Sequence, residues 1–185
     1  MAHQMRESAA DSQIGRPWDS GTPSAWVLDA TQSTFAFRVK HFWGLVTVQG
    51  HFTQVEGQAT VDAAGAVAVS VRIDAASLDT KQQQRDKHLR SADFFHVEQH
   101  PTVTFVSRQV TPLGADRLRV DGDLTAAGRT LPLTFEARLS TSGERITVDA
   151  AVPVDRTVFG MTWSPLGMAA ATALLVVHAQ FTKTS

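Results

Sequence analysis

The chain has 185 residues, 43% of them hydrophobic, which is enough for one domain with a sizeable core. With 17 Lys and Arg residues against 18 Asp and Glu, the formal net charge is -1, so no basic field favours nucleic acid as a partner. The absence of cysteine excludes disulfides, thiolate nucleophiles and cysteine-based metal sites.

Residues 1–23 are rich in Ser, Gly, Pro and charge and show no hydrophobic periodicity. This composition predicts a flexible tail that precedes a single domain at residues 24–185. The tail lacks the apolar core of a secretory signal, and no run approaches the roughly 20 apolar residues that span a bilayer. We therefore expect a cytoplasmic protein without a membrane span.

From Ser24 onward the sequence alternates apolar and polar residues, a pattern typical of half-buried β-strands. Antiparallel strands joined by short Gly- or Pro-containing turns form either a sandwich or a closed barrel. Bulky side chains on the inward faces favour the wider solution, an all-β up-and-down barrel of about eight strands that holds one ligand. The strand-like runs lie at 33–41, 46–52, 57–63, 66–74, 101–110, 117–126, 129–139, 144–154 and 171–183.

One polar and charged stretch, TKQQQRDKHLRSADFF, interrupts this β pattern. Thr80 and Gln83 have the spacing of a capping box, which predicts a short helix that begins near Lys81. The apolar stripe of this helix is nearly bare, so we expect it to lie on the surface or across an opening. Phe94 and Phe95 follow it and would anchor the segment in an apolar mouth.

Five stretches in sequence order, between Trp26 and Lys183, resemble the YceI family of lipocalin-like, polyisoprenoid-binding proteins. They are WVLDATQSTFAFRVKH, VQGHF, SLDTKQQQRDKHLRSADFFHVEQHPTVTF, VDGDLTAAGRTLPLTF and DRTVFGMTW. The third is the longest and the most specific. The resemblance implies an extended eight-stranded antiparallel barrel, a helical insertion near residues 81–95 and a long apolar tunnel for an isoprenoid chain. It also implies a homodimer, which would shield the apolar residues of HFWG and LLVVHAQF.

Candidate ligand contacts fall into a tunnel wall and a polar mouth. At the mouth, Arg85, His88 and Arg90 are candidates for contact with a lipid head group. An equally good interpretation is that Asp86 and Arg90, four residues apart, form an ion pair that only supports the helix. The predicted wall residues are Phe35, Phe37, Val39, Phe42, Phe52, Val71, Ile73, Leu89, Phe94, Phe95, Phe105, Phe135, Phe159, Met161 and Trp163.

Other polar residues give weaker indications of chemistry. His96 and His100 have helical spacing for two metal ligands, but Pro101 favours an extended His100, so we predict no metal site. His41 ends an apolar strand face, where a hydrogen-bonded core histidine is expected. Asp155 and Arg156 are expected to form a salt bridge that fixes their turn.

The sequence contains no GxSxG motif, no cysteine and no spacing that suggests a catalytic triad, so we predict neither catalytic residues nor a cofactor. The predicted function is to bind a long-chain isoprenoid lipid, either a polyprenyl lipid or an isoprenoid quinone, for transport, storage or sequestration. Burial of such a chain is favourable by roughly 0.8 kcal/mol per CH₂. Two alternatives stay open: an enzyme that acts on an isoprenoid or fatty-acyl lipid, and an interaction module with a solid core.

Overall fold

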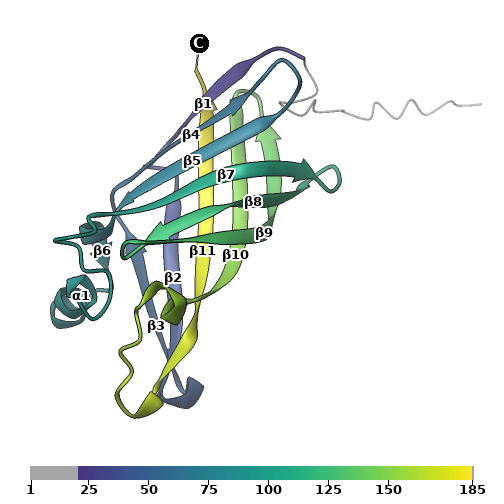
Figure 1. Ribbon diagram of the computed structural model, residues 1–185. Coiled ribbons are helices and arrows are strands. Elements are labelled where there is room, and N and C mark those ends of the chain that lie inside the picture. Colours follow the sequence, from purple (N-terminus) through teal and green to yellow (C-terminus); the bar gives the residue numbers. More distant parts are fainter. Residues whose placement is uncertain (1–20, 185) are drawn as a thin grey trace, which may run out of the picture.

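The computed structural model describes residues 21–184, which form a β-barrel with one short α-helix (Figure 1). The single helix of this region is α1 (Gln83–Arg90), and short 3-10 turns are η1 (Phe42–Gly44), η2 (Ala75–Ser77), η3 (Arg156–Phe159) and η4 (Pro165–Gly167). The strands are β1 (Ser24–Leu28), β2 (Thr34–His41), β3 (Val46–Phe52), β4 (Val55–Val61), β5 (Val67–Asp74), β6 (Leu78–Asp79), β7 (Thr102–Pro112), β8 (Arg117–Ala126), β9 (Arg129–Ser142), β10 (Arg145–Asp155) and β11 (Ala169–Lys183).

Eight antiparallel strands close into a ring in the order β1, β4, β5, β7, β8, β9, β10 and β11, and β11 returns to β1. The closing contact involves only the end of β11, where Leu28 pairs with Phe181 and Trp26 with Lys183. Along the rest of β11 its neighbour is β2, followed by β3 and the two-residue β6. The predicted all-β, eight-stranded antiparallel barrel with a short helix is confirmed.

The barrel opens at the end that carries α1. Pairing between β9 and β10 stops at Arg138 and Asp149, and beyond this point β9 continues beside β8 while β10 continues beside β11. The two halves of the wall therefore separate, and η3 and α1 lie at this end (Figure 1). The interior therefore has an open end beside α1 and a closed end opposite to it.

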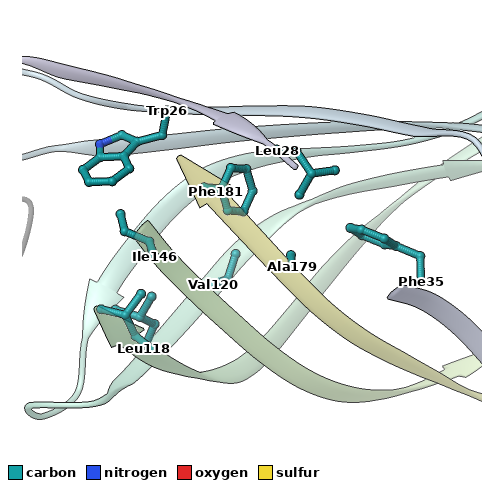
Figure 2. Close-up of a cluster of buried hydrophobic side chains, with 9 residues drawn as sticks. Trp26, Leu28, Phe35, Leu118, Val120, Ile146, Ala179 and Phe181 are labelled. Carbon is teal, nitrogen blue, oxygen red and sulfur yellow. The ribbon is translucent and has the colours of Figure 1, made fainter. Parts of the chain in front are cut away.

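The opposite end is closed by packed apolar side chains. Figure 2 shows that they come from β1, β8, β10 and β11 as well as from the start of β2. Trp26 is 5% exposed, and its indole N–H donates a hydrogen bond to the Ser24 hydroxyl. The cluster consists of Trp26, Leu28, Phe35, Leu118, Val120, Leu139, Ile146, Ala179 and Phe181.

Helix α1 begins at Gln83, later than the capping-box spacing predicted, and Thr80 is not its N-cap. Lys81 has a positive φ of 63°, and its amide donates to the Asp79 carboxylate, so the chain is still turning at this residue. Gln82 is the N-cap and makes no side-chain capping bond. Interactions with β6, rather than a local capping box, therefore decide where the helix starts.

No helix among residues 21–184 is long and apolar enough to cross a membrane. The predicted tail, residues 1–23, lies outside the described region except for its last three residues.

Candidate ligand-binding cavity

An apolar cavity of about 280 Å³ lies inside the barrel. All eight strands of the ring contribute to its wall, together with β2, β3, Leu89 of α1 and the two phenylalanines that follow the helix, Phe94 and Phe95. Among the described residues that line it, Thr104 and Arg156 are the only two that are polar. Such a space can accommodate an apolar molecule but offers very few groups for recognition.

Residues halfway along the cavity face inward without being fully buried. Val71, Phe135 and Val177 line the space and are half-buried, whereas Trp26 and Phe181 at the closed end are buried. In a solid core the central side chains would be the most buried. This burial pattern therefore corresponds to an open interior with a packed floor.

Two glycines allow large rings to lie close to the wall. A Cβ atom on Gly50 would come within 2.5 Å of the Phe37 ring, and one on Gly122 would come equally close to the Phe105 ring. Any larger residue at these positions would displace a ring. The phenylalanines thus lie over strand backbone, which helps to leave the middle of the barrel open.

Strand β10 forms one continuous row along the cavity. Its alternate residues from Ile146 to Val154 all line the space, and Arg156 is the next member of the same series. At roughly 3.4 Å per residue, the eight steps from Ile146 to Val154 make this apolar row about 27 Å long. The row therefore starts in the closed end and finishes at a guanidinium near the open end.

Most of the predicted wall residues line this cavity, but two do not. Phe42 lies in η1 with a positive φ and is 46% exposed. Trp163 is 40% exposed and its ring lies 4.4 Å from the His88 ring, outside the cavity wall. The residues that line the cavity as predicted are Phe35, Phe37, Val39, Phe52, Val71, Ile73, Leu89, Phe94, Phe95, Phe105, Phe135, Phe159 and Met161.

The sequence interpretation missed several wall residues. Trp26 lies at the closed end, and the alanines of β4, β10 and β11 provide width. The period-two alternation of these strands was the available signal, but alanine is found on both the inward and the outward faces of strands, so its side chain alone does not indicate which face is buried. The small residues concerned are Ala59, Ala150, Ala173 and Ala179.

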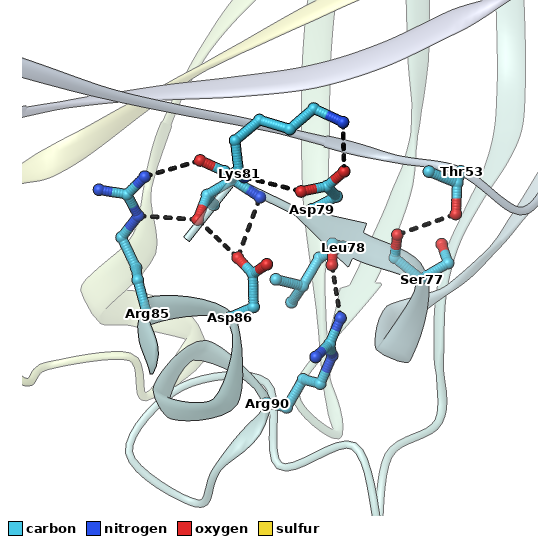
Figure 3. Close-up of polar contacts among 9 residues, drawn as sticks. Thr53, Ser77, Leu78, Asp79, Lys81, Arg85, Asp86 and Arg90 are labelled. Carbon is cyan, nitrogen blue, oxygen red and sulfur yellow. Dashed lines mark hydrogen bonds and ion pairs between the residues drawn. The ribbon is translucent and has the colours of Figure 1, made fainter. Parts of the chain in front are cut away.

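Three charged residues of α1, Arg85, Asp86 and Arg90, fasten the helix to β6 and to Thr80 directly after it instead of facing the cavity (Figure 3). The Asp86 carboxylate is buried and accepts hydrogen bonds from the Thr80 amide at 2.9 Å and from the Thr80 hydroxyl at 2.5 Å. Arg85 donates to the Thr80 hydroxyl and carbonyl oxygens, both at 2.8 Å. Arg90 donates to the Leu78 carbonyl at 2.6 Å. The alternative interpretation, an ion pair between Asp86 and Arg90, is therefore wrong, because Asp86 is bound to Thr80 and Arg90 to the Leu78 carbonyl.

His88 lies on a side of α1 that does not face the cavity. Its Nε2 atom is 2.9 Å from the Asp93 carboxylate, and its ring is edge-on to both Phe94 and Trp163. Neither His88 nor the two arginines of the helix line the cavity. Only Leu89 of α1 does, so the helix presents an apolar residue to the interior.

Arg156 does not form the expected salt bridge with Asp155. The Asp155 carboxylate instead accepts hydrogen bonds from the amide and hydroxyl of Thr157, which lower the pKa of Asp155. Arg156 is only 7% exposed and donates to the carbonyl oxygens of Ala170, Ala169 and Met161. Burial lowers its pKa from the ordinary value, whereas the charge of Asp155 raises it. An arginine nevertheless stays protonated in proteins.

The histidines of the described part of the chain do not form a cluster that could hold a metal ion. The His96 and His100 rings are 5.7 Å apart, and residues 21–184 contain no group of three or more His, Cys, Asp or Glu side chains that could hold a metal ion. His41 is half-buried and its ring lies edge-on to Phe42. The expected hydrogen bond of a core histidine is not formed at His41, because this residue ends its strand at an exposed turn.

Comparison with known proteins agrees with this fold. The model of the YceI-like domain matches residues 26–181. The chain belongs to the YceI-like domain family. Protein YceI of Escherichia coli O157:H7 is 42% identical over 110 residues, which cover 58% of this chain and 56% of that protein. The matched segments span less than two thirds of the curated relatives, from 56% to 65% of their lengths.

Solved structures with the YceI-like fold superpose well on this chain. Burkholderia cenocepacia BcnA has a TM-score of 0.77 at 24% identity, covering 83% of this chain and 98% of BcnA. A polyisoprenoid binding domain from Saccharophagus degradans, implicated in plant cell wall breakdown, has a TM-score of 0.72 at 16% identity, covering 86% of this chain and 98% of that domain. At these identities the likeness shows that the fold is shared.

Proposed function

We propose that this YceI-family protein binds one long-chain isoprenoid lipid, a polyprenyl lipid or an isoprenoid quinone, inside the barrel. The observation that carries the proposal is the cavity, which has a wall of apolar side chains, a packed floor and an apolar row about 27 Å long on β10. Each CH₂ group that leaves water contributes roughly 0.8 kcal/mol. Affinity therefore comes mainly from chain length, and the protein transports, stores or sequesters the lipid.

The Saccharophagus degradans domain supports the choice of an isoprenoid, since it shares the fold and is described as polyisoprenoid binding. Branched isoprenoid units also suit a wall that contains both large phenylalanine rings and small alanines. A fatty acid or a fatty amide is the second choice.

The segment 80–101 acts in this proposal as the cover of the open end. Leu89, Phe94 and Phe95 contact the hydrocarbon chain of the lipid. Arg85 and Arg90 hold the helix beside β6 through backbone carbonyls. The earlier assignment of these arginines to a head group is less well supported, because their bonds are directed at the protein itself.

The enzyme alternative is less well supported by the site. Among residues 21–184 that line the cavity there is no serine, histidine or carboxylate to act as nucleophile or base. We therefore propose that a bound lipid leaves the protein chemically unchanged.

A second copy of the chain is proposed as a partner, through the apolar tip of the barrel. At the turn between β2 and β3, Trp43 is 76% and Leu45 is 85% exposed, and Leu166 of η4 is 87% exposed. The two turns are neighbours, since His41 pairs with Ala169. Light scattering over a dilution series tests this: a dimer mass that Leu45→Ser lowers to the monomer mass supports the contact, and a monomer mass throughout contradicts it.

The other segment expected to need shielding, LLVVHAQF, does not support a dimer. Leu175, Val177, Ala179 and Phe181 of this stretch line the cavity. Its alternate residues therefore face the interior instead of a second copy.

Binding of unbranched and isoprenoid alcohols of increasing length tests the proposed function. We expect affinity to rise with each added unit until the tail reaches the floor formed by Trp26 and Phe181, and then to stop rising. Tryptophan fluorescence and calorimetry measure this series, and the recovered alcohols are checked for chemical change. Absence of binding at every length would contradict the proposal.

A further inference from the structure

Arg156 is a buried cation that forms no ion pair with any carboxylate of residues 21–184. It is only 7% exposed. The pairs that are formed in this region involve other, more exposed side chains, and the adjacent Asp155 binds Thr157 instead. A guanidinium is rarely buried unless it is paired, because removing its charge from water is costly.

The hydrogen bonds of Arg156 leave part of its binding capacity free. A guanidinium has five N–H donors, and in this structure three of them are directed at carbonyl oxygens, those of Met161, Ala169 and Ala170. Carbonyl oxygens are neutral, so the positive charge is not compensated by them. The Phe94 ring, whose centroid is 6.0 Å from the guanidinium carbon, adds only a weak cation–π contact.

The position of this guanidinium relative to the cavity is informative. Arg156 lines the cavity next to Phe94 and Met161, at the open end of the row that begins with Ile146. An elongated ligand with its tail at the closed end would place its head beside this side chain. The cavity is thus apolar along its length and cationic at one point.

We propose that Arg156 is an anion-binding subsite of the cavity, which binds a phosphate or carboxylate at the head of the long-chain lipid. The inference rests on the proposed lipid-binding function and specifies the class of lipid: acidic amphiphiles are preferred over neutral ones. Planar, paired N–H groups match the oxygen atoms of phosphate and carboxylate, and such charge-assisted bonds are strong in a site with little water.

Matched pairs of ligands with the same chain test the subsite. Geranylgeranyl phosphate is compared with geranylgeraniol, and palmitate with hexadecanol, by calorimetry at pH 7.5. We expect the anionic member of each pair to bind about tenfold or more tightly, a ratio that corresponds to about 1.4 kcal/mol. Preference in the phosphate pair alone would identify phosphate as the head group, and preference in both pairs would identify any compact oxyanion; both outcomes support the subsite.

Two variants separate anion binding from a role in holding the fold. Arg156→Met keeps much of the side-chain volume without the charge and should reduce the ratio within each pair to about one. Arg85→Met is the matched control, because Arg85 also donates to a backbone carbonyl but does not line the cavity, so it should leave the ratio unchanged. Equal ratios in Arg156→Met and the wild type would overturn the proposal.

The wild-type protein alone keeps the test decisive if Arg156→Met does not fold. Equal affinity of wild type for geranylgeranyl phosphate and geranylgeraniol would overturn the anion subsite while leaving the lipid-binding proposal intact. Failure of both ligands to bind would contradict the lipid-binding proposal itself.

Discussion

Filling the cavity should stabilise the protein and weaken lipid binding at the same time. Ala150 lies in the middle of the β10 row and lines the open space. Ala150→Leu adds three carbon atoms, which the cavity of about 280 Å³ can accommodate. At roughly 0.8 kcal/mol per buried carbon group, we expect the free energy of unfolding to rise by up to about 2 kcal/mol when both proteins are compared after removal of bound lipid. In a solid core the same change would cost about 1–3 kcal/mol through overpacking.

Chemical denaturation with urea measures the change in unfolding free energy, and displacement of a fluorescent prenyl lipid measures binding. The matched control is Ala151→Leu, the adjacent residue of β10, which is exposed and points away from the cavity. We expect the control to leave lipid affinity unchanged. Destabilisation by Ala150→Leu with unchanged lipid binding would refute the conclusion that the barrel interior is an open ligand site.

Three further changes have defined outcomes. Phe37→Asp introduces a carboxylate at a wall position that is 7% exposed, and it should lower the free energy of unfolding, measured in urea, by about 3–5 kcal/mol or more. A variant as stable as the wild type would contradict the buried position of Phe37. Arg85→Ala should lower the free energy of unfolding by about 1–3 kcal/mol, because its hydrogen bonds to Thr80 are lost. Affinity should fall equally for charged and neutral lipids, and a loss for charged lipids alone would show that Arg85 contacts the head group. The Thr134 hydroxyl lowers the pKa of Asp121 in the folded protein, so the unfolded chain takes up a proton at this residue more readily. The free energy of unfolding should therefore fall as pH decreases through about 4, the usual pKa of an aspartate. Denaturation at pH 7 and pH 3 should show a smaller loss for Asp121→Asn than for wild type, and equal losses would contradict this role.

The strands were predictable because period-two alternation reports which face is buried. The runs at residues 46–52 and 117–126 coincide with β3 and β8, and the other predicted runs differ from the observed strands mainly at their ends, whereas β1 was not among the predicted runs. The helix was likewise predicted to lie at the surface, because it has too few apolar residues on one face to be held in place by burial of that face. Strand β6 has two residues and leaves no periodic signal.

The polar contacts were harder to predict because they depend on groups that are brought together only by the fold. The helix spacing suggested an Asp86–Arg90 pair, but the Thr80 amide and the Leu78 carbonyl compete successfully for these side chains. Asp155 and Arg156 are adjacent, and neighbouring residues at a strand end point in opposite directions, so one binds at the surface while the other enters the cavity.

The most direct measurement is quantitative mass spectrometry of an organic extract of the purified protein, with Ala150→Leu purified in parallel. The account predicts a long-chain isoprenoid lipid in an amount approaching one molecule per chain, and much less of it in the variant. An extract without any long-chain lipid, from protein that also fails to take up added polyprenyl lipids or isoprenoid quinones, would contradict the account.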